Sequence, residues 1–139
     1  MTSYLLDTDT FSLYLQKDVN VSRAVFRHLA SPMAVSIITV REVWDGWAAA
    51  IARAKSPNVL SATYSRLTET VNALSFWTVV SFAVPAIARY ETLKKQKLNV
   101  GGNDLRIASI ALELGATVVT RNRRDFTRIP GVVVEDWSV

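Results

Sequence analysis

Short apolar runs alternate along the chain with longer segments in which apolar residues recur at helical spacing. The short runs predict buried strands, and the longer segments predict amphipathic helices. We expect strands at residues 4–6, 35–38, 77–80, 116–120 and 132–134. We expect helices at residues 11–16, 22–30, 39–55, 58–74, 85–97 and 105–114. Strands that alternate with helices indicate an α/β domain in which a parallel sheet is covered on both faces.

The two longest predicted helices follow one another, and the short turn between them contains Pro57. This arrangement predicts a helical hairpin. The first helix has an apolar stripe that we expect to be buried, formed by Trp44, Trp47, Ala48 and Ile51. Gly46 costs about 1 kcal/mol relative to Ala in a helix interior, which is consistent with a close approach of another backbone there.

Composition narrows the function classes. The chain has 139 residues, which we assign to a single domain, and its net charge of +4 favours a polyanionic partner such as nucleic acid. The absence of cysteine excludes disulfides, thiolate metal sites and thiol catalysis. The one histidine, His28, excludes histidine-rich metal sites and is expected on a helix surface. No secretory signal or membrane-spanning segment is evident, so we expect a cytoplasmic protein.

Carboxylates follow the predicted strands. Asp7 comes directly after the first strand, with Asp9 two residues later, and Glu42 lies in the first turn after the second strand. Because the carboxyl ends of parallel strands share one edge of a sheet, these side chains are expected to meet there. Each also has a purely structural interpretation: Asp7 can cap a turn, and Thr39 with Glu42 has the spacing of a helix capping box.

Asp104 begins the helix that leads into the fourth strand, where a cap or first-turn acid is common. By simple alternation this position belongs to the opposite edge of the sheet. Asp104 joins the other acids only if the preceding helix approaches from the carboxyl edge. The residues alone leave both placements open.

The segment beyond the fourth strand is rich in arginine and short polar residues. Asn122 and Asp125 are interleaved there with Arg121, Arg123 and Arg124. Clustered carboxylate and amide oxygens suit Mg²⁺ or Mn²⁺, which can activate water and neutralise charge on a phosphate. Arginines bind phosphate oxygens in pairs. The combined chemistry is that of phosphodiester hydrolysis.

The chain resembles the PIN-domain family in four stretches that occur in the family's order: residues 5–9, 36–42, 103–108 and 119–126. Pro130-Gly131-Val132 and Asp136-Trp137 also resemble the end of that family's sequences. Within that family the chain resembles the VapC-type ribonuclease toxins of toxin–antitoxin pairs. The resemblance covers the whole chain. It implies a three-layer α/β/α sandwich with a parallel five-stranded sheet in the order 3-2-1-4-5, and it implies that Asp104 reaches the acidic cluster.

The resemblance also implies a site and partners. Asp7, Glu42 and Asp104 match the family's metal-binding acids, and Asn122 matches a fourth catalytic position that is often Asp. Asp9 and Asp125 are candidate auxiliary acids, and Arg121, Arg123 and Arg124 are candidate contacts to RNA phosphates. Family members use Mg²⁺ or Mn²⁺, cleave RNA, often form homodimers and are inhibited by a small antitoxin that also binds DNA.

Two other interpretations remain open at this stage. Asp7-Thr8-Asp9-Thr10 after an apolar strand also resembles the first motif of haloacid-dehalogenase-type phosphatases, in which the first Asp is a nucleophile. The basic charge balance would equally serve an RNA-binding module without catalysis.

Overall fold

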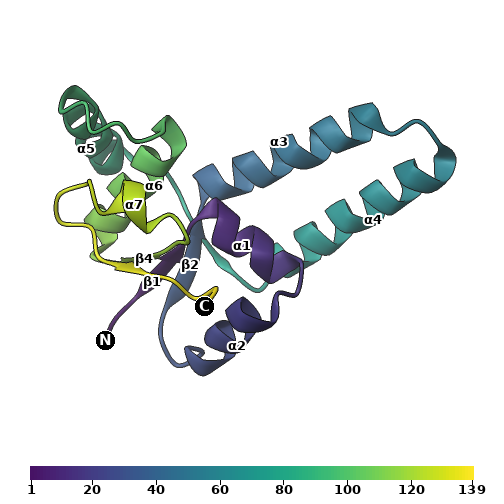
Figure 1. Cartoon of the computed structure of the whole chain (residues 1–139), viewed down its shortest axis with the longest axis horizontal. Coiled ribbons are helices and arrows are strands. Elements are labelled where there is room, and N and C mark those ends of the chain that lie inside the picture. The colour runs from purple at the N-terminus through teal and green to yellow at the C-terminus, as the bar shows by residue number, and fades with distance from the viewer.

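Five parallel strands form one sheet in the order β3-β2-β1-β4-β5 in the computed structural model, which describes residues 1–139 (Figure 1). Their bounds are β1 Tyr4–Leu6, β2 Met33–Ser36, β3 Thr78–Val80, β4 Thr117–Val119 and β5 Val134–Glu135. The predicted sheet and its strand order are confirmed. The second strand begins and ends two residues earlier than expected, and the fifth is displaced towards the C-terminus.

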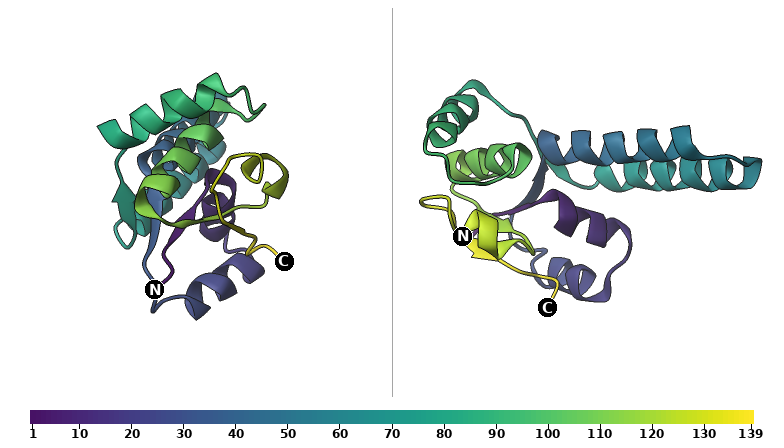
Figure 2. Two further views of the ribbon diagram at one scale, coloured as in Figure 1. Left: turned by 90° about the vertical axis from the view of Figure 1, so that its left-hand side faces the viewer. Right: turned by 45° about the horizontal axis from the view of Figure 1, so that its top comes forward.

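Helices cover both faces of the sheet, which gives the expected three layers (Figure 2). Leu6, Val35 and Val119 are fully buried in one core, with α1 (Thr8–Leu15) and α2 (Val19–Arg27). Leu5 and Val118 are buried in the other core, with helices α5, α6 and α7. These three helices span Val84–Lys95, Gly102–Leu114 and Arg123–Phe126. Alternate residues of β1 therefore anchor opposite layers of the domain.

Two helices begin directly at the ends of strands. Asp7 follows β1 and accepts a hydrogen bond from the Thr10 backbone N–H, so α1 begins at Thr8 rather than near residue 11. Ser36 ends β2 and accepts from the Thr39 N–H, so α3 begins at Ile37. The capping box that was the structural alternative for Thr39 and Glu42 does not form, because Ser36 caps the helix, and Glu42 lies in the second turn rather than the first.

Helices α3 (Ile37–Arg53) and α4 (Pro57–Leu74) form the predicted hairpin, which projects away from the sheet (Figure 1). The Trp47 indole N–H donates to Thr70 Oγ1 at 3.0 Å and ties the two helices together. The expected burial of the apolar stripe is wrong, since Trp44 and Ala48 are exposed and Trp47 is only half-buried. Nothing lies within 4 Å of a Cβ placed on Gly46, so no other backbone approaches it.

The direction of α6 decides where Asp104 lies. The helix is mostly buried, as expected, and Gly115 ends it in the left-handed conformation with φ 66°. The chain then enters β4 almost at once, so α6 must run antiparallel to that strand. Its first turn therefore lies at the carboxyl edge of the sheet. The placement of Asp104 at the opposite edge by simple alternation is wrong, because a crossover helix returns the chain from the carboxyl edge to the amino edge.

Aromatic packing fixes the C-terminal segment. Trp137 is buried, as expected, and stacks on the His28 ring with centroids 4.5 Å apart. Tyr4 packs edge-on against the same His28 ring, which is half-buried rather than on the surface. His28 is thus a packing residue.

No helix combines the length and apolarity needed to cross a membrane.

Candidate acidic site at the carboxyl edge of the sheet

Asp7 is the buried centre of the site. Its Oδ2 accepts a hydrogen bond of 2.6 Å from the Thr120 hydroxyl, and its Oδ1 accepts one of 2.9 Å from the Thr10 backbone N–H. The Thr120 hydroxyl also accepts from the Asn122 N–H at 2.8 Å. Burial raises the pKa of the Asp7 carboxyl, although the hydrogen bonds from Thr120 and Thr10 act in the opposite direction. Thr120 therefore orients Asp7 and links it to the loop after β4.

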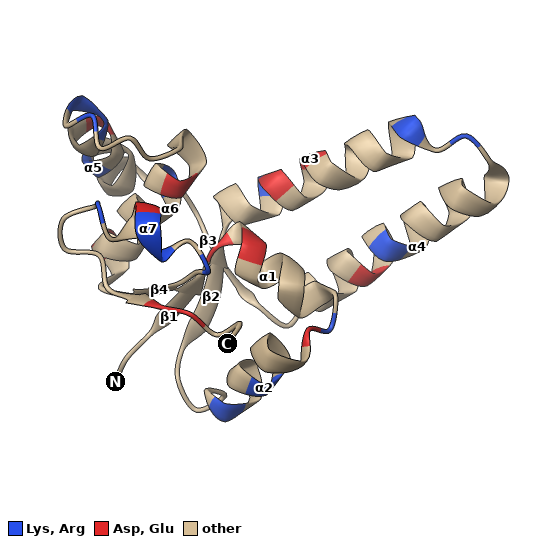
Figure 3. Ribbon diagram, viewed as in Figure 1, with Lys and Arg blue, Asp and Glu red and all other residues tan.

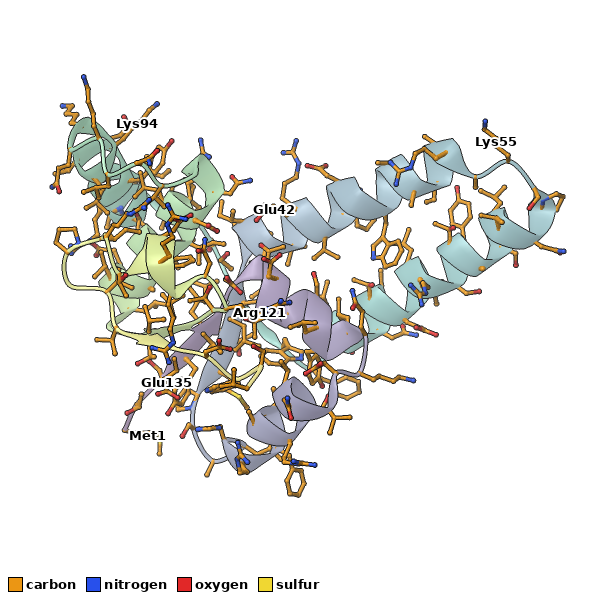
Figure 4. The ribbon with its side chains drawn as sticks, viewed as in Figure 1. Met1, Glu42, Lys55, Lys94, Arg121 and Glu135 are labelled. Atoms are coloured by element: carbon orange, nitrogen blue, oxygen red, sulfur yellow. The ribbon has the colours of Figure 1, made fainter.

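Glu42 reaches the site from α3. The Thr8 hydroxyl donates to Glu42 Oε1 at 2.5 Å and lies 3.1 Å from the Thr39 hydroxyl. Figure 4 shows the Glu42 and Arg121 side chains beside the start of α1. Thr8, which immediately follows Asp7, thus joins α1 to α3 and holds one carboxylate oxygen of Glu42.

Asp104 completes the acidic group from the first turn of α6. Burial and then the negative charge of Asp7 raise the pKa of the Asp104 carboxyl to about 6, and the charges of Glu42 and Asp9 act in the same direction. The Asn122 side-chain amide donates to Asp104 Oδ2 at 3.4 Å and lowers the pKa. Figure 3 shows acidic residues at the starts of α1, α3 and α6 near one end of the sheet. The structure brings Asp7, Glu42 and Asp104 together.

Asn122 and Asp125 have structural partners. The Asn122 Oδ1 accepts from the Asp125 backbone N–H and caps α7, while its Nδ2 donates to Asp125 Oδ2 at 2.9 Å. The other oxygen of Asp125 pairs with Arg128 Nη1 at 3.2 Å. Asp9 is exposed and contributes negative charge beside the other acids. Of the two auxiliary candidates, Asp9 is the one without such partners.

The acidic site offers carboxylate oxygens, which are the ligands that a hard divalent cation prefers. A bound cation would also reduce the repulsion among these carboxylates. The side chains are nevertheless not arranged as a ready metal-binding group of three or more ligands. Glu42 Oε1 is occupied by Thr8, and Asn122 Oδ1 is occupied in capping α7. The residues fit a cation in kind, and the second carboxylate oxygen of Glu42 makes no hydrogen bond within the chain.

The three arginines after β4 remain available as cations beside the acids. Arg121 lies in the turn, and Arg123 and Arg124 are exposed on α7 (Figure 3). The chain's three ion pairs involve other arginines. Positive charge is therefore presented directly next to the acidic group.

Sequence reasoning missed three hydroxyl residues that organise the site, namely Thr8, Thr39 and Thr120. Thr39 and Thr120 are fully buried, and Thr8 is half-buried. The available signal was positional, because Thr8 immediately follows Asp7 and Thr120 immediately follows β4. A hydroxyl at a strand end beside an acid is a candidate for positioning that acid.

The sequence matches the family model of the PIN domain over residues 4–132. The chain therefore belongs to the PIN-domain family, and the resemblance drawn from its motifs is confirmed. The match gives no support to the phosphatase interpretation of Asp7-Thr8-Asp9-Thr10.

Relatives within the family are VapC proteins. The chain is 33% identical over 137 residues to the tRNA(fMet)-specific endonuclease VapC of Salmonella typhimurium, covering 99% of both proteins. It is 28% identical to ribonuclease VapC2 of Rickettsia felis, covering 97% of this chain and 98% of that protein. The fold matches the DNA-bound VapBC structure from Salmonella typhimurium with a TM-score of 0.81 at 27% identity, over 99% of each chain.

Proposed function

We propose that this protein is a metal-dependent endoribonuclease of the VapC type, which hydrolyses phosphodiester bonds in RNA. The observation that carries the proposal is the meeting of Asp7, Glu42 and Asp104 at one edge of the sheet. The raised pKa of Asp104, to about 6, supports a cationic occupant because a divalent ion would relieve the repulsion among these acids. The named activities of the VapC relatives support the same reaction.

Each side chain of the site has a distinct part in this proposal. Asp7, Glu42 and Asp104 would hold Mg²⁺ or Mn²⁺, which would supply an activated water and offset charge on the phosphate. Thr120 keeps the Asp7 carboxylate oriented, and Thr8 restrains Glu42. Asn122 donates to Asp104 and holds the start of α7 in place. The arginines after β4 would bind RNA phosphates through charge-assisted hydrogen bonds.

A cleavage assay with labelled single-stranded RNA tests this function. Fragments should appear with Mg²⁺ or Mn²⁺ and disappear with EDTA, and Asp7→Asn, Glu42→Gln and Asp104→Asn should each remove most activity. Asp45→Asn is the matched control, because Asp45 is on α3 close to Glu42, is exposed, and pairs only with Arg41. Binding of RNA without cleavage under any metal condition would favour the non-catalytic binding module.

We further propose that an antitoxin of the VapB type is the partner of this chain. A groove of about 1260 Å³ lies between α1, α2, α3 and α4, and it extends to Thr8 and Glu42 at the acidic site. Exposed apolar side chains line it, including Phe26 of α2 and Leu29 just beyond the end of that helix. Similar structures are complexes of VapB with VapC, from Rickettsia felis and Salmonella typhimurium. A partner segment in this groove would cover Phe26, Leu29 and the half-buried Trp47, and it would adjoin Glu42. Homodimer formation and cytoplasmic location remain predictions.

A further inference from the structure

A second, smaller cleft opens beside the acidic site. It has a volume of about 500 Å³ and is lined by Asp9, Ser12, Leu13, Gln16, Arg121 and Asn122. This volume lies within the roughly 300–1,000 Å³ typical of small-ligand sites. Five of its six lining residues are polar or charged. The cleft therefore suits a ligand with several hydrogen-bonding groups.

One face of α1 forms the long wall of this cleft. Asp9, Ser12, Leu13 and Gln16 recur at positions i, i+3, i+4 and i+7, which places them on the same side of the helix. Asp9 lies in the first turn of α1, next to the acidic site. Gln16 is seven residues further on, which is roughly 10 Å along the helix axis at a rise of about 1.5 Å per residue. A strand of RNA that ran along α1 from a cleaved bond at the acids would reach Gln16 with a neighbouring nucleotide.

Three polar side chains that line the cleft are free to bind a ligand. The side chains of Ser12, Gln16 and Arg121 take no part in the hydrogen bonds or ion pairs within the chain, whereas those of the acidic site do. A glutamine amide offers a donor beside an acceptor, and a serine hydroxyl offers both in one group. Nucleobases present such pairs on their edges, and proteins read single-stranded RNA mainly through those edges.

We propose that this cleft is a subsite for the base of a nucleotide next to the cleaved bond. Gln16 and Ser12 contact the base edge, Leu13 packs against its apolar face, and Arg121 binds the adjoining phosphate. The subsite deepens the proposed ribonuclease function and rests on it. Gln16 and Ser12 are its specificity-determining residues, and neither takes part in the bond cleavage itself.

Sequencing the ends of fragments cut from a randomised RNA pool tests the subsite. Gln16→Ala should reduce the base preference at one position flanking the cut by about tenfold, since a well-placed pair of hydrogen bonds discriminates bases by such factors. Ser12→Ala should weaken the preference at that same position. Gln96→Ala is the matched control, because Gln16 and Gln96 are the chain's two glutamines and each is an exposed helix C-cap. An unchanged preference profile in Gln16→Ala would overturn the subsite and leave the ribonuclease function intact.

A second measurement decides the subsite even where the wild type cuts no RNA. In EDTA, four-nucleotide RNAs of A, C, G or U would be titrated into ¹⁵N-labelled protein. We expect the Gln16 side-chain amide and the Arg121 Nε signals to shift, while the Gln96 amide stays in place. Stationary Gln16 signals with all four RNAs would exclude the subsite, whereas absent cleavage with shifting Gln16 signals would count against the proposed function alone.

Discussion

At the residue scale, Asp104 is an acid whose pKa is raised by burial and by its neighbouring carboxylates. Its pKa is raised from the usual 3.8 to about 6, chiefly by burial and then by Asp7. The folded protein therefore holds this proton more tightly than the unfolded chain does. The stabilisation from the protonated carboxyl is present below pH about 4 and is lost as the pH rises through about 6.

Asp104→Asn should remove this pH dependence. In EDTA at pH 7.5 the variant should melt at a higher temperature than the wild type, and the difference should shrink towards pH 4.5. Added Mn²⁺ should raise the melting temperature of the wild type more at pH 7.5 than at pH 5, because protons compete with the ion. Thermal melts across this pH range make the comparison. A difference that is independent of pH would show that Asp104 is not responsible.

Thr120 has the opposite role, because it stabilises a buried charge. Thr120→Val should destabilise the protein by about 1–3 kcal/mol, since it leaves Asp7 Oδ2 and the Asn122 N–H without their partner. The loss should grow with pH, because removing this hydrogen bond raises the pKa of Asp7 further. Thr120→Ser retains the hydroxyl and is the control. Urea denaturation at pH 5 and pH 8 measures both variants, and equal stability of Val and Ser at this position would contradict the role.

At the scale of elements, the sequence predicted the strands, the sheet order through the resemblance, and the hairpin. The starts of helices were less predictable, because Asp7 and Ser36 end a strand and cap the next helix at the same position. Local hydrophobic patterns predict a loop at such residues and therefore place the start of the helix too late in the sequence. The position of Asp104 also depended on the direction of α6, which follows from the short connection through Gly115 into β4. Counting alternating elements assigned Asp104 to the wrong edge, because it ignored that a helix leading directly into a strand runs antiparallel to it.

The apolar stripe of α3 was misplaced for a different reason. Periodicity shows that Trp44 and Trp47 share an apolar face, but it does not show what covers that face. In this chain the hairpin extends beyond the sheet, so Trp44 remains 54% exposed. Its apolar residues are consistent with a surface that a partner completes.

Gly46 provides a test of the groove between α1, α2, α3 and α4. It lines the groove, and nothing lies within 4 Å of an added Cβ. Gly46→Leu should therefore fold, gain up to about 1 kcal/mol in stability from helix propensity and retain ribonuclease activity. It should weaken binding of the VapB-type partner by occupying the groove. Ala49→Leu on an exposed position of α3 outside the groove is the control, measured by calorimetric titration. Equal affinities of the two variants would place the partner elsewhere.

At the scale of the whole molecule, the acidic site lies within a chain that is basic overall. The net charge is +4, although Asp7, Asp9, Glu42 and Asp104 share one edge of the sheet. An RNA strand must bring its phosphates towards these acids. Positive charge at α7 is thus more effective for binding than the same charge on a distant helix, because screening limits such attraction to about 10 Å at 0.1 M salt.

Two double variants separate local from overall charge. Arg123→Ala with Arg124→Ala, on α7, and Arg23→Ala with Arg27→Ala, on α2, each reduce the net charge to +2 at exposed positions. If the α7 arginines contact phosphates, the first pair should weaken RNA binding and reduce the slope of log affinity against log salt by about 1 to 2, because fewer counterions are released. The second pair should have a much smaller effect. Binding of a non-cleavable RNA analogue, measured by fluorescence anisotropy from 50 to 300 mM salt, compares them. Equal slopes for both pairs would show that RNA responds only to overall charge and would remove Arg123 and Arg124 from the binding surface.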